Sequence, residues 1–240
     1  MVRVAPDSND VLVLPLNDGP VRHLNKGTAT NADWTFYGGT VSKAAGILDM
    51  ETDFNAIYIP GSNFSQTRSG TGGANDVLVS PNISLSGWVF LRKYPPSYGE
   101  LFNKQYFVNA WSSPFLTFGF QMNNTVDGRC ALYITTDGVL REIISTFAFP
   151  LPLGKWFHLG GTWDGTNLIM YVNGNVYASG TFPGTISYPS AGTRGQWYAG
   201  GILSTTNQEA PAIIQDIRLA NITRPQSYFA NIAHQGLFVP

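Results

Sequence analysis

Carboxylate pairs are the first chemistry to test in this chain, because glycoside hydrolysis uses two of them beside the scissile bond. The two carboxyl groups lie about 5–5.5 Å apart in retaining enzymes and about 6.5–9.5 Å apart in inverting ones. The glutamates of the chain are Glu51, Glu100, Glu142 and Glu209. No two of them are close in sequence, and the nearest approach to a cluster is Glu51 with Asp53. A solvated turn explains that pair, so the carboxylates predict no hydrolase.

Other catalytic chemistry also lacks its residues. Cys130 is the only cysteine, and its setting fits a small apolar residue in a strand. The histidines, His23, His158 and His234, lie far apart along the chain. The sequence has no nucleophile-elbow motif, no phosphate-binding glycine loop and no His/Cys metal spacing. We therefore expect no catalytic residue and no enzymatic activity.

A metal ion is the one cofactor question that the sequence leaves open. Calcium binds six to eight oxygen atoms, which aspartates, amides and backbone carbonyls supply. At least two aspartates would have to meet in the fold, and the candidates are Asp49, Asp53, Asp127, Asp137 and Asp164. No residue is assigned as a metal ligand. Calcium stays an alternative, and no other cofactor is expected.

Aromatic residues gather between positions 94 and 122. A strand with a period of two cannot bury all of them on one face, so we expect a loop at 105–114 with partly exposed rings. Exposed aromatic rings stack on sugars or anchor protein interfaces. The candidate contact residues, for a glycan or a protein, are Tyr94, Tyr98, Tyr106, Asn109 and Trp111. The alternative is a loop folded back over the edge of the sheets, with its aromatic rings used for packing.

The elements that must hold these residues are strands joined by tight turns, most clearly within 155–180. Asp164-Gly165 and Asn173-Gly174 mark two chain reversals there, because both dipeptides tolerate the positive φ of hairpin turns. The alternation between the turns predicts a half-buried strand. Its two faces are expected to carry Leu168, Met170 and Val172 on one side and Ile169 and Tyr171 on the other. In 114–122, the expected faces are Leu116, Phe118 and Phe120 against Phe115, Thr117 and Gly119.

Strand-like segments recur along the whole chain. We expect them near 11–19, 34–37, 57–59, 83–93, 98–104, 114–122, 129–136, 140–147, 155–163, 167–173, 176–182, 196–202 and 212–219. Residues 225–234 fit a helix, with Pro225 suited to its first turn. Residues 61–76 fit a flexible surface loop or an insertion used in contact. The pattern predicts an all-β sandwich of two antiparallel sheets in one domain, 1–240.

The segment 155–180 resembles the laminin-G-like, concanavalin A-like jelly-roll family, whose hallmark runs Trp-x-His, Thr-Trp-Asp-Gly and Tyr-Val-Asn-Gly. The matching residues are Trp156, His158, Thr162, Trp163, Asp164, Gly165, Leu168, Tyr171, Val172, Asn173 and Gly174. Further similar pieces at 11–19, 45–60, 83–89 and 214–226 extend the resemblance over roughly 10–236. The resemblance implies a jelly-roll core of 10–236, a short C-terminal helix, and interior positions for Trp88, Trp156 and Trp163.

The resemblance also bears on the candidate residues. It implies structural roles for His158, hydrogen-bonded within the fold, and for Asp216. Glucanases of the family carry their carboxylates in a Glu-x-Asp-x-Glu pattern, which this chain lacks. Pentraxin-like members bind calcium through a Glu-Gln-Asp cluster, which is missing from 201–209. The fold alone does not determine an activity.

Composition excludes some partners. The net charge is −1, and charged residues make up 12% of the chain, about half the usual share. Nucleic-acid affinity depends on many basic contacts to phosphates, and the 14 lysines and arginines do not cluster. The N-terminal residues lack the apolar core of a signal peptide, and no run approaches transmembrane length. We expect no nucleic-acid partner, no membrane and no signal peptide.

Domains similar to this one occur among bacteriophage virion proteins. The resemblance therefore implies a non-enzymatic structural or attachment protein of a virus particle, a capsid decoration or a tail component. Such a protein is made in the host cytoplasm, joins the virion as part of an oligomeric assembly, and docks on other virion proteins through its sandwich edges and aromatic loops. The alternative is a lectin-type module that binds a neutral cell-surface glycan. The two roles are compatible.

Overall fold

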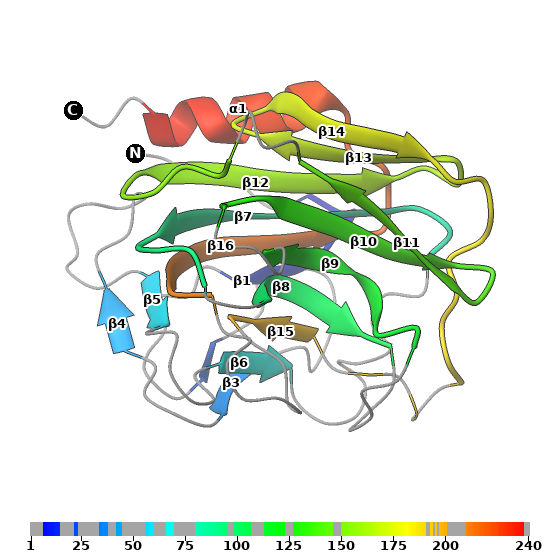
Figure 1. Ribbon diagram of the computed structural model, residues 1–240, viewed down its shortest axis with the longest axis horizontal. Coiled ribbons are helices and arrows are strands. Elements are labelled where there is room, and N and C mark those ends of the chain that lie inside the picture. Colours follow the sequence, from blue (N-terminus) through cyan, green and yellow to red (C-terminus); the bar gives the residue numbers. More distant parts are fainter. Residues whose placement is uncertain are drawn as a thin grey trace.

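The structure of the protein is a computed structural model. It describes residues 7–14, 22–23, 34–37, 42–44, 56–59, 66–69, 80–95, 98–106, 113–122, 127–145, 150–190, 193, 195, 197–200 and 210–237. These residues form two β-sheets and one helix, α1 (Gln226–Leu237). In Figure 1, β10 and β11 of one sheet pass in front of the strands of the other, and α1 runs along β12, β13 and β14.

Sheet A contains the hallmark hairpins. Its strand order is β14 (Asn175–Thr181), β13 (Asn167–Val172), β12 (Trp156–Trp163), β7 (Ile83–Leu91), β16 (Ala212–Ala220), β5 (Ala56–Ile59) and β4 (Ser42–Ala44), with β1 (Asp10–Leu14) also paired to β16. Each of these pairs is antiparallel.

Sheet B contains the aromatic segment. Its order is β11 (Val139–Ile144), β10 (Cys130–Thr136), β9 (Leu116–Met122), β8 (Gly99–Gln105), β15 (Trp197–Ala199), β6 (Gln66–Ser69), β3 (Trp34–Tyr37) and β2 (Arg22–His23). All its pairs are antiparallel as well. The expected sandwich of two antiparallel sheets with one C-terminal helix is confirmed.

The core between the sheets follows from the period-2 alternation of the strands. Every second side chain turns inward, and these are apolar on both sheets. The fully buried set includes Ile83, Leu85, Val89, Phe118, Phe120, Leu132, Ile134, Phe157, Leu159, Trp163, Leu168, Met170, Ile214 and Leu219. Burial of this apolar surface is the main force that holds the two sheets face to face.

A second apolar layer lies on the outer face of sheet A, under α1. Trp88 packs against Ile232 of the helix, and Phe229 stacks on Tyr171 with ring centroids 4.7 Å apart. His158 meets Trp88 edge to face at 5.3 Å. Helix α1 therefore gives this face a hydrophobic partner.

The turns hold α1 in place as well as joining strands. Asn173 and Gly174 both have positive φ, at 50° and 77°, which is the conformation of a tight type I′ hairpin. A Cβ on Gly174 would collide with the backbone of Ala230 in α1. Glycine therefore serves twice at this position, in the turn and in the close approach of the helix.

Several expectations need correction. Gln66–Ser69, expected in the loop 61–76, forms β6, because β3 and β15 pair with it on both sides and satisfy its backbone. The rest of 61–76 lies outside the described residues. Leu116 does not share a face with Phe118: the pairing of β8 with β9 shifts register between Lys104 and Gln105, and Leu116 packs with Ala131 and Tyr133 outside the core.

The predicted tryptophan positions are largely confirmed. Trp88 and Trp163 are fully buried, but only Trp163 belongs to the core between the sheets. Trp156 is half-buried and packs with the Trp88 cluster beside α1.

The helix expected at 225–234 begins at Gln226 and ends at Leu237, with the carbonyl of Pro225 accepting from the backbone N–H of Tyr228.

Candidate ligand-binding site

The described candidate residues of the aromatic segment separate into different environments. Tyr94 turns inward, where its hydroxyl donates to the carbonyl of Leu151 at 2.8 Å, and burial raises its pKa. Tyr106 directly follows β8, and its N–H donates to the carbonyl of Phe115 at 3.0 Å. Tyr98 lines an open cavity. Asn109 and Trp111 lie outside the described residues.

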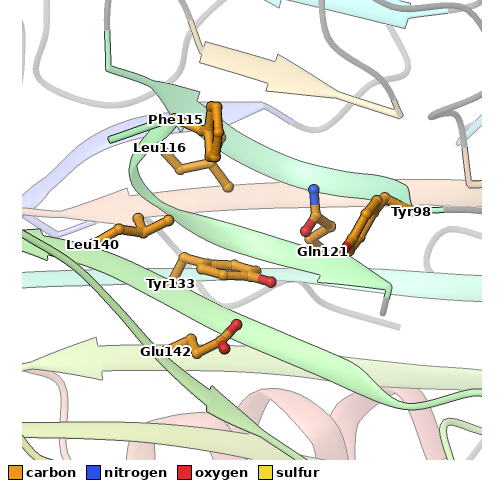
Figure 2. Close-up of a pocket in the computed structure, with 7 residues that line it drawn as sticks. All are labelled: Tyr98, Phe115, Leu116, Gln121, Tyr133, Leu140 and Glu142. Carbon is orange, nitrogen blue, oxygen red and sulfur yellow. The ribbon is translucent and has the colours of Figure 1, made fainter. Parts of the chain in front are cut away.

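The cavity lies on the outer face of sheet B, on the side away from the core, and has a volume of about 380 Å³. Its described lining consists of Tyr98, Phe115, Leu116, Gln121, Tyr133, Leu140 and Glu142. Figure 2 shows Phe115, Leu116 and Leu140 toward one end, while the polar tips of Tyr98, Gln121, Tyr133 and Glu142 lie toward the other. The site therefore has an apolar part and a polar part.

Strand register brings these residues together. Asp137 and Gly138 form a two-residue turn with φ of 50° and 76°, so Thr136 pairs with Val139 and, further along, Tyr133 pairs with Glu142. Gly119 of β9 lies opposite Tyr133 on its other side and adds no side chain to the site. The shifted register at the end of β8 turns Leu116 to the same outer face.

Tyr133 forms the floor of the cavity and is 9% exposed. Burial, first, and the nearby Glu142 carboxylate raise the pKa of its phenol. The phenol therefore stays protonated, with the Glu142 carboxylate close to its hydroxyl (Figure 2). Glu142 itself is exposed at the edge of the cavity.

A buried carboxyl group lies beside the polar part on the same face of sheet B, because Glu100 of β8 pairs directly with Gln121 of β9. Glu100 is fully buried, and burial raises its pKa to about 8. Asn103 donates to one of its oxygens at 2.8 Å, and the amide nitrogen of Gln121 donates to the other. Since the nitrogen of Gln121 is used in this way, its amide oxygen faces the side of Tyr133, as Figure 2 shows.

The two described glutamates differ in their settings. Glu100 lies on β8 and Glu142 on β11, with β9 and β10 between them. Glu100 is fully buried and held by two amides, whereas Glu142 is exposed. Neither was a candidate site residue.

The other candidate nucleophile and base lie elsewhere. Cys130 points into the core between the sheets, and burial raises the pKa of its thiol. His158 lies under α1, where burial and Arg218 lower its pKa to about 3. The backbone N–H of His158 donates to the side-chain oxygen of Asn173 at 2.8 Å. Its ring nitrogen Nδ1 has no hydrogen-bond partner among the described residues, and the ring packs against Trp88 and Phe229.

The aspartates considered as calcium ligands are dispersed where they are described. Asp127 pairs with Arg129 at 2.8 Å, Asp137 accepts from the backbone of Thr185, and Asp164 closes its own turn. Asp49 and Asp53 lie outside the described residues. In the described ranges, no three His, Cys, Asp or Glu side chains are placed to hold a metal ion.

Asp216 has a structural position, as the resemblance implied. It lies at a bulge of β16 with φ of 52° and pairs with Arg218 at 2.9 Å in the buried layer.

Among the residues described, no helix is long and apolar enough to cross a bilayer.

Sequence reasoning missed most of the cavity. Gln121, Tyr133 and Glu142 were not candidates, although the Asp137-Gly138 turn predicts their strand register. A two-residue hairpin at that turn pairs positions 136 with 139 and 133 with 142. The tyrosine and the carboxylate could thus have been placed opposite each other from the sequence.

Known proteins resemble the chain at two levels. The sequence profile of the family described as "Concanavalin A-like lectin/glucanases superfamily" matches residues 56–227. No curated protein is similar enough in sequence to count as a match.

Solved structures share the fold at low sequence identity. Domain 4 of an extracellular GH43 arabinanase from Geobacillus stearothermophilus, solved in complex with arabinotriose, superposes with a TM-score of 0.65 at 19% identity, over 94% of this chain and 98% of that one. The receptor-binding domain of a botulinum neurotoxin mosaic serotype C/D gives 0.68 at 13% identity, over 96% and 52%. The sialidase of Trypanosoma rangeli gives 0.67 at 12%, over 98% and 34%. The chain thus spans about half of the toxin domain and a third of the sialidase, and these likenesses concern the fold.

Proposed function

The chain belongs to the concanavalin A-like lectin/glucanase superfamily, and on that premise we propose that it is a glycan-binding module that does not cleave its ligand. The observation that carries the proposal is the cavity on the outer face of sheet B, with its apolar and polar parts. Its volume of about 380 Å³ falls within the range of small-molecule sites.

The lining suits a sugar because a sugar ring is itself two-sided. Its C–H face packs on aromatic and aliphatic groups, here Phe115, Leu116 and Leu140. Its hydroxyl edge needs fixed hydrogen-bonding groups, here the tips of Tyr98, Gln121 and Tyr133. Such a combination of apolar lining and a few placed polar groups is typical of ligand sites.

The settings of the two described glutamates support binding without hydrolysis. A glycosidase needs an acid and a second carboxylate on either side of one bond, whereas Glu100 is fully buried and held by two amides, and Glu142 alone of the two is exposed at the cavity. The similar domain of the arabinanase was solved with arabinotriose, which fits the proposal and concerns that protein.

A glycan array followed by calorimetric titration tests the proposal. Replacing Tyr98 by Ala removes a half-buried ring from the lining and should weaken binding at least about fivefold, given about 1–3 kcal/mol for a lost anchor. Tyr94→Phe is the matched control, because the Tyr94 hydroxyl is directed to Leu151 rather than to the cavity. An array without any bound glycan, or full affinity in Tyr98→Ala, would contradict the proposal.

The virion role is a narrower proposal within this one. A glycan-binding module on a phage capsid or tail would attach the particle to host glycans, in keeping with the weakly charged surface expected from the composition. The measurement is co-purification: the protein should occur in stoichiometric amount in washed particles. Its recovery only in the particle-free lysate would leave the glycan-binding proposal intact and remove the virion role.

A further inference from the structure

Resting on the proposed glycan-binding function, we infer that the cavity selects neutral sugars over acidic ones, with Glu100 as the positioning residue that fixes this preference. The inference depends on which polar atoms the cavity presents. A ligand must supply hydrogen-bond donors where the protein offers acceptors, because an unpaired buried polar group is costly.

The orientation of Gln121 is the first part of the argument. An amide side chain offers two donor hydrogens on one side and an acceptor oxygen on the other. The nitrogen of Gln121 donates to Glu100, so the acceptor is the atom presented toward Tyr133. The side-chain amide of Asn103 also donates a hydrogen bond to Glu100, at 2.8 Å. This bond holds the carboxyl group in place beside Gln121.

Glu142 adds a second acceptor and a negative charge. Its carboxylate is exposed at the edge of the cavity, close to the Tyr133 hydroxyl. The described lining residues include no lysine, arginine or histidine, so nothing in this part of the wall offsets the charge of Glu142.

These features distinguish two classes of sugar. A neutral sugar donates its hydroxyl hydrogens to Gln121 and Glu142, and bonds to a charged acceptor are the stronger kind. The carboxylate of an acidic sugar would meet the acceptor of Gln121 and the like charge of Glu142. The repulsion between the two carboxylates lowers the affinity by about fivefold to several hundredfold, depending on how much solvent lies near them.

The test compares pairs of oligosaccharides that differ only in oxidation of a primary hydroxyl to a carboxylate. Each neutral oligosaccharide bound on the array is titrated beside its oxidised counterpart, and the ratio of the two dissociation constants is measured. For the wild type, the neutral member should bind at least about tenfold more tightly. Equal or tighter binding of the acidic member overturns the inference and leaves glycan binding standing; binding of neither member overturns the proposed function, and the inference with it.

Two variants locate the cause of the preference. Glu142→Gln keeps the shape and removes the charge, and should lower the ratio at least threefold. Glu100→Gln replaces the carboxyl group by an amide whose added N–H₂ group can donate to the oxygen of Gln121. Gln121 can then turn its nitrogen to the cavity, and the ratio should again fall. Arg141→Gln is the control: it changes the charge of the neighbouring exposed residue, whose cross-strand partner is the core residue Ile134, and should leave the ratio unchanged. The inference is overturned if the ratio stays at the wild-type value in both glutamate variants. If Glu100→Gln folds poorly, an unchanged ratio in Glu142→Gln alone overturns it.

Discussion

Tyr133 and Glu142 lie directly opposite each other on β10 and β11, and the carboxylate of Glu142 is close enough to the phenol of Tyr133 to raise its pKa. The pair joins the buried floor of the cavity to its exposed edge. A residue that is 9% exposed thus lies beside one that solvent reaches.

Tyr133→Phe should weaken glycan binding with little effect on folding. The substitution keeps the ring that forms the floor and removes only the hydroxyl, so the free energy of unfolding should fall by about 1 kcal/mol. Glycan affinity should fall about fivefold, because the ligand loses a hydrogen-bonding group at the floor of the cavity. Calorimetric titration and urea unfolding measure the two effects, and an unchanged affinity would show that the hydroxyl faces no ligand.

Glu100→Gln should change the pH dependence of stability. Unfolded, the carboxyl has its ordinary pKa of 4.5, and folded it has a pKa of about 8. Between these values the folded state holds a proton that the unfolded state has lost. Its contribution to the free energy of unfolding is therefore complete below pH 4.5 and declines as the pH rises toward 8, with a slope of up to about 1.4 kcal/mol per pH unit.

Urea unfolding of wild type and Glu100→Gln at several pH values between 5 and 8 measures this effect. The difference between the two proteins should shift in favour of the variant as the pH rises, because glutamine does not titrate. A difference that stays constant over this range would mean that Glu100 has an ordinary pKa in the folded protein.

His158→Phe should have the opposite effect, on the acid side. The pKa of His158 falls from 6.5 to about 3 on folding. Between these pH values the unfolded state binds a proton that the folded state does not bind. Wild-type stability from this group is present above pH 6.5 and is lost as the pH falls toward 3. Phenylalanine keeps an aromatic ring beside Trp88 and should flatten that loss, as measured by unfolding between pH 4 and 7. If both proteins lose the same stability between pH 7 and pH 4, the lowered pKa of His158 in the folded state is contradicted.

Gly160→Ala should destabilise the protein through α1. A Cβ at this position would lie 2.5 Å from a ring carbon of Phe229, and overpacking of this kind typically costs about 1–3 kcal/mol. Phe229→Ala alone should cost about 3–5 kcal/mol, because it empties a fully buried site.

The double variant separates this contact from other effects of the two substitutions. With the ring of Phe229 gone, the alanine at position 160 has room, and its cost should largely disappear. Urea unfolding of the two single variants and the double variant forms the cycle. Strict additivity would mean that Gly160 is needed for a reason other than the approach of α1.

The fold was predictable because its local signals agree with one another. Alternation in 155–172, the Asn173-Gly174 turn and Pro225 before the helix each correspond to the structure. These signals depend on neighbours in the chain, which a sequence displays directly. The strand β6 escaped prediction because its stability comes from β3 and β15 on either side, far away in sequence.

The site was predictable only in part, for a related reason. Tyr98 was identified by its place in an aromatic run, whereas Gln121 is a functional candidate only because Glu100 lies opposite it on β8. The outward turn of Leu116 depends on a register shift that no local pattern announces. Tyr133 and Glu142 were within reach, since a two-residue turn determines which residues across a hairpin face each other.

The position of α1 has a consequence for how the chain matures. The helix follows every described strand in sequence, so during synthesis it leaves the ribosome after all of them. Until then Trp88, His158 and Tyr171 have no cover on the outer face of sheet A. In any state in which α1 has not docked, these aromatic side chains are open to solvent, and exposed apolar surface of this kind favours aggregation and chaperone binding.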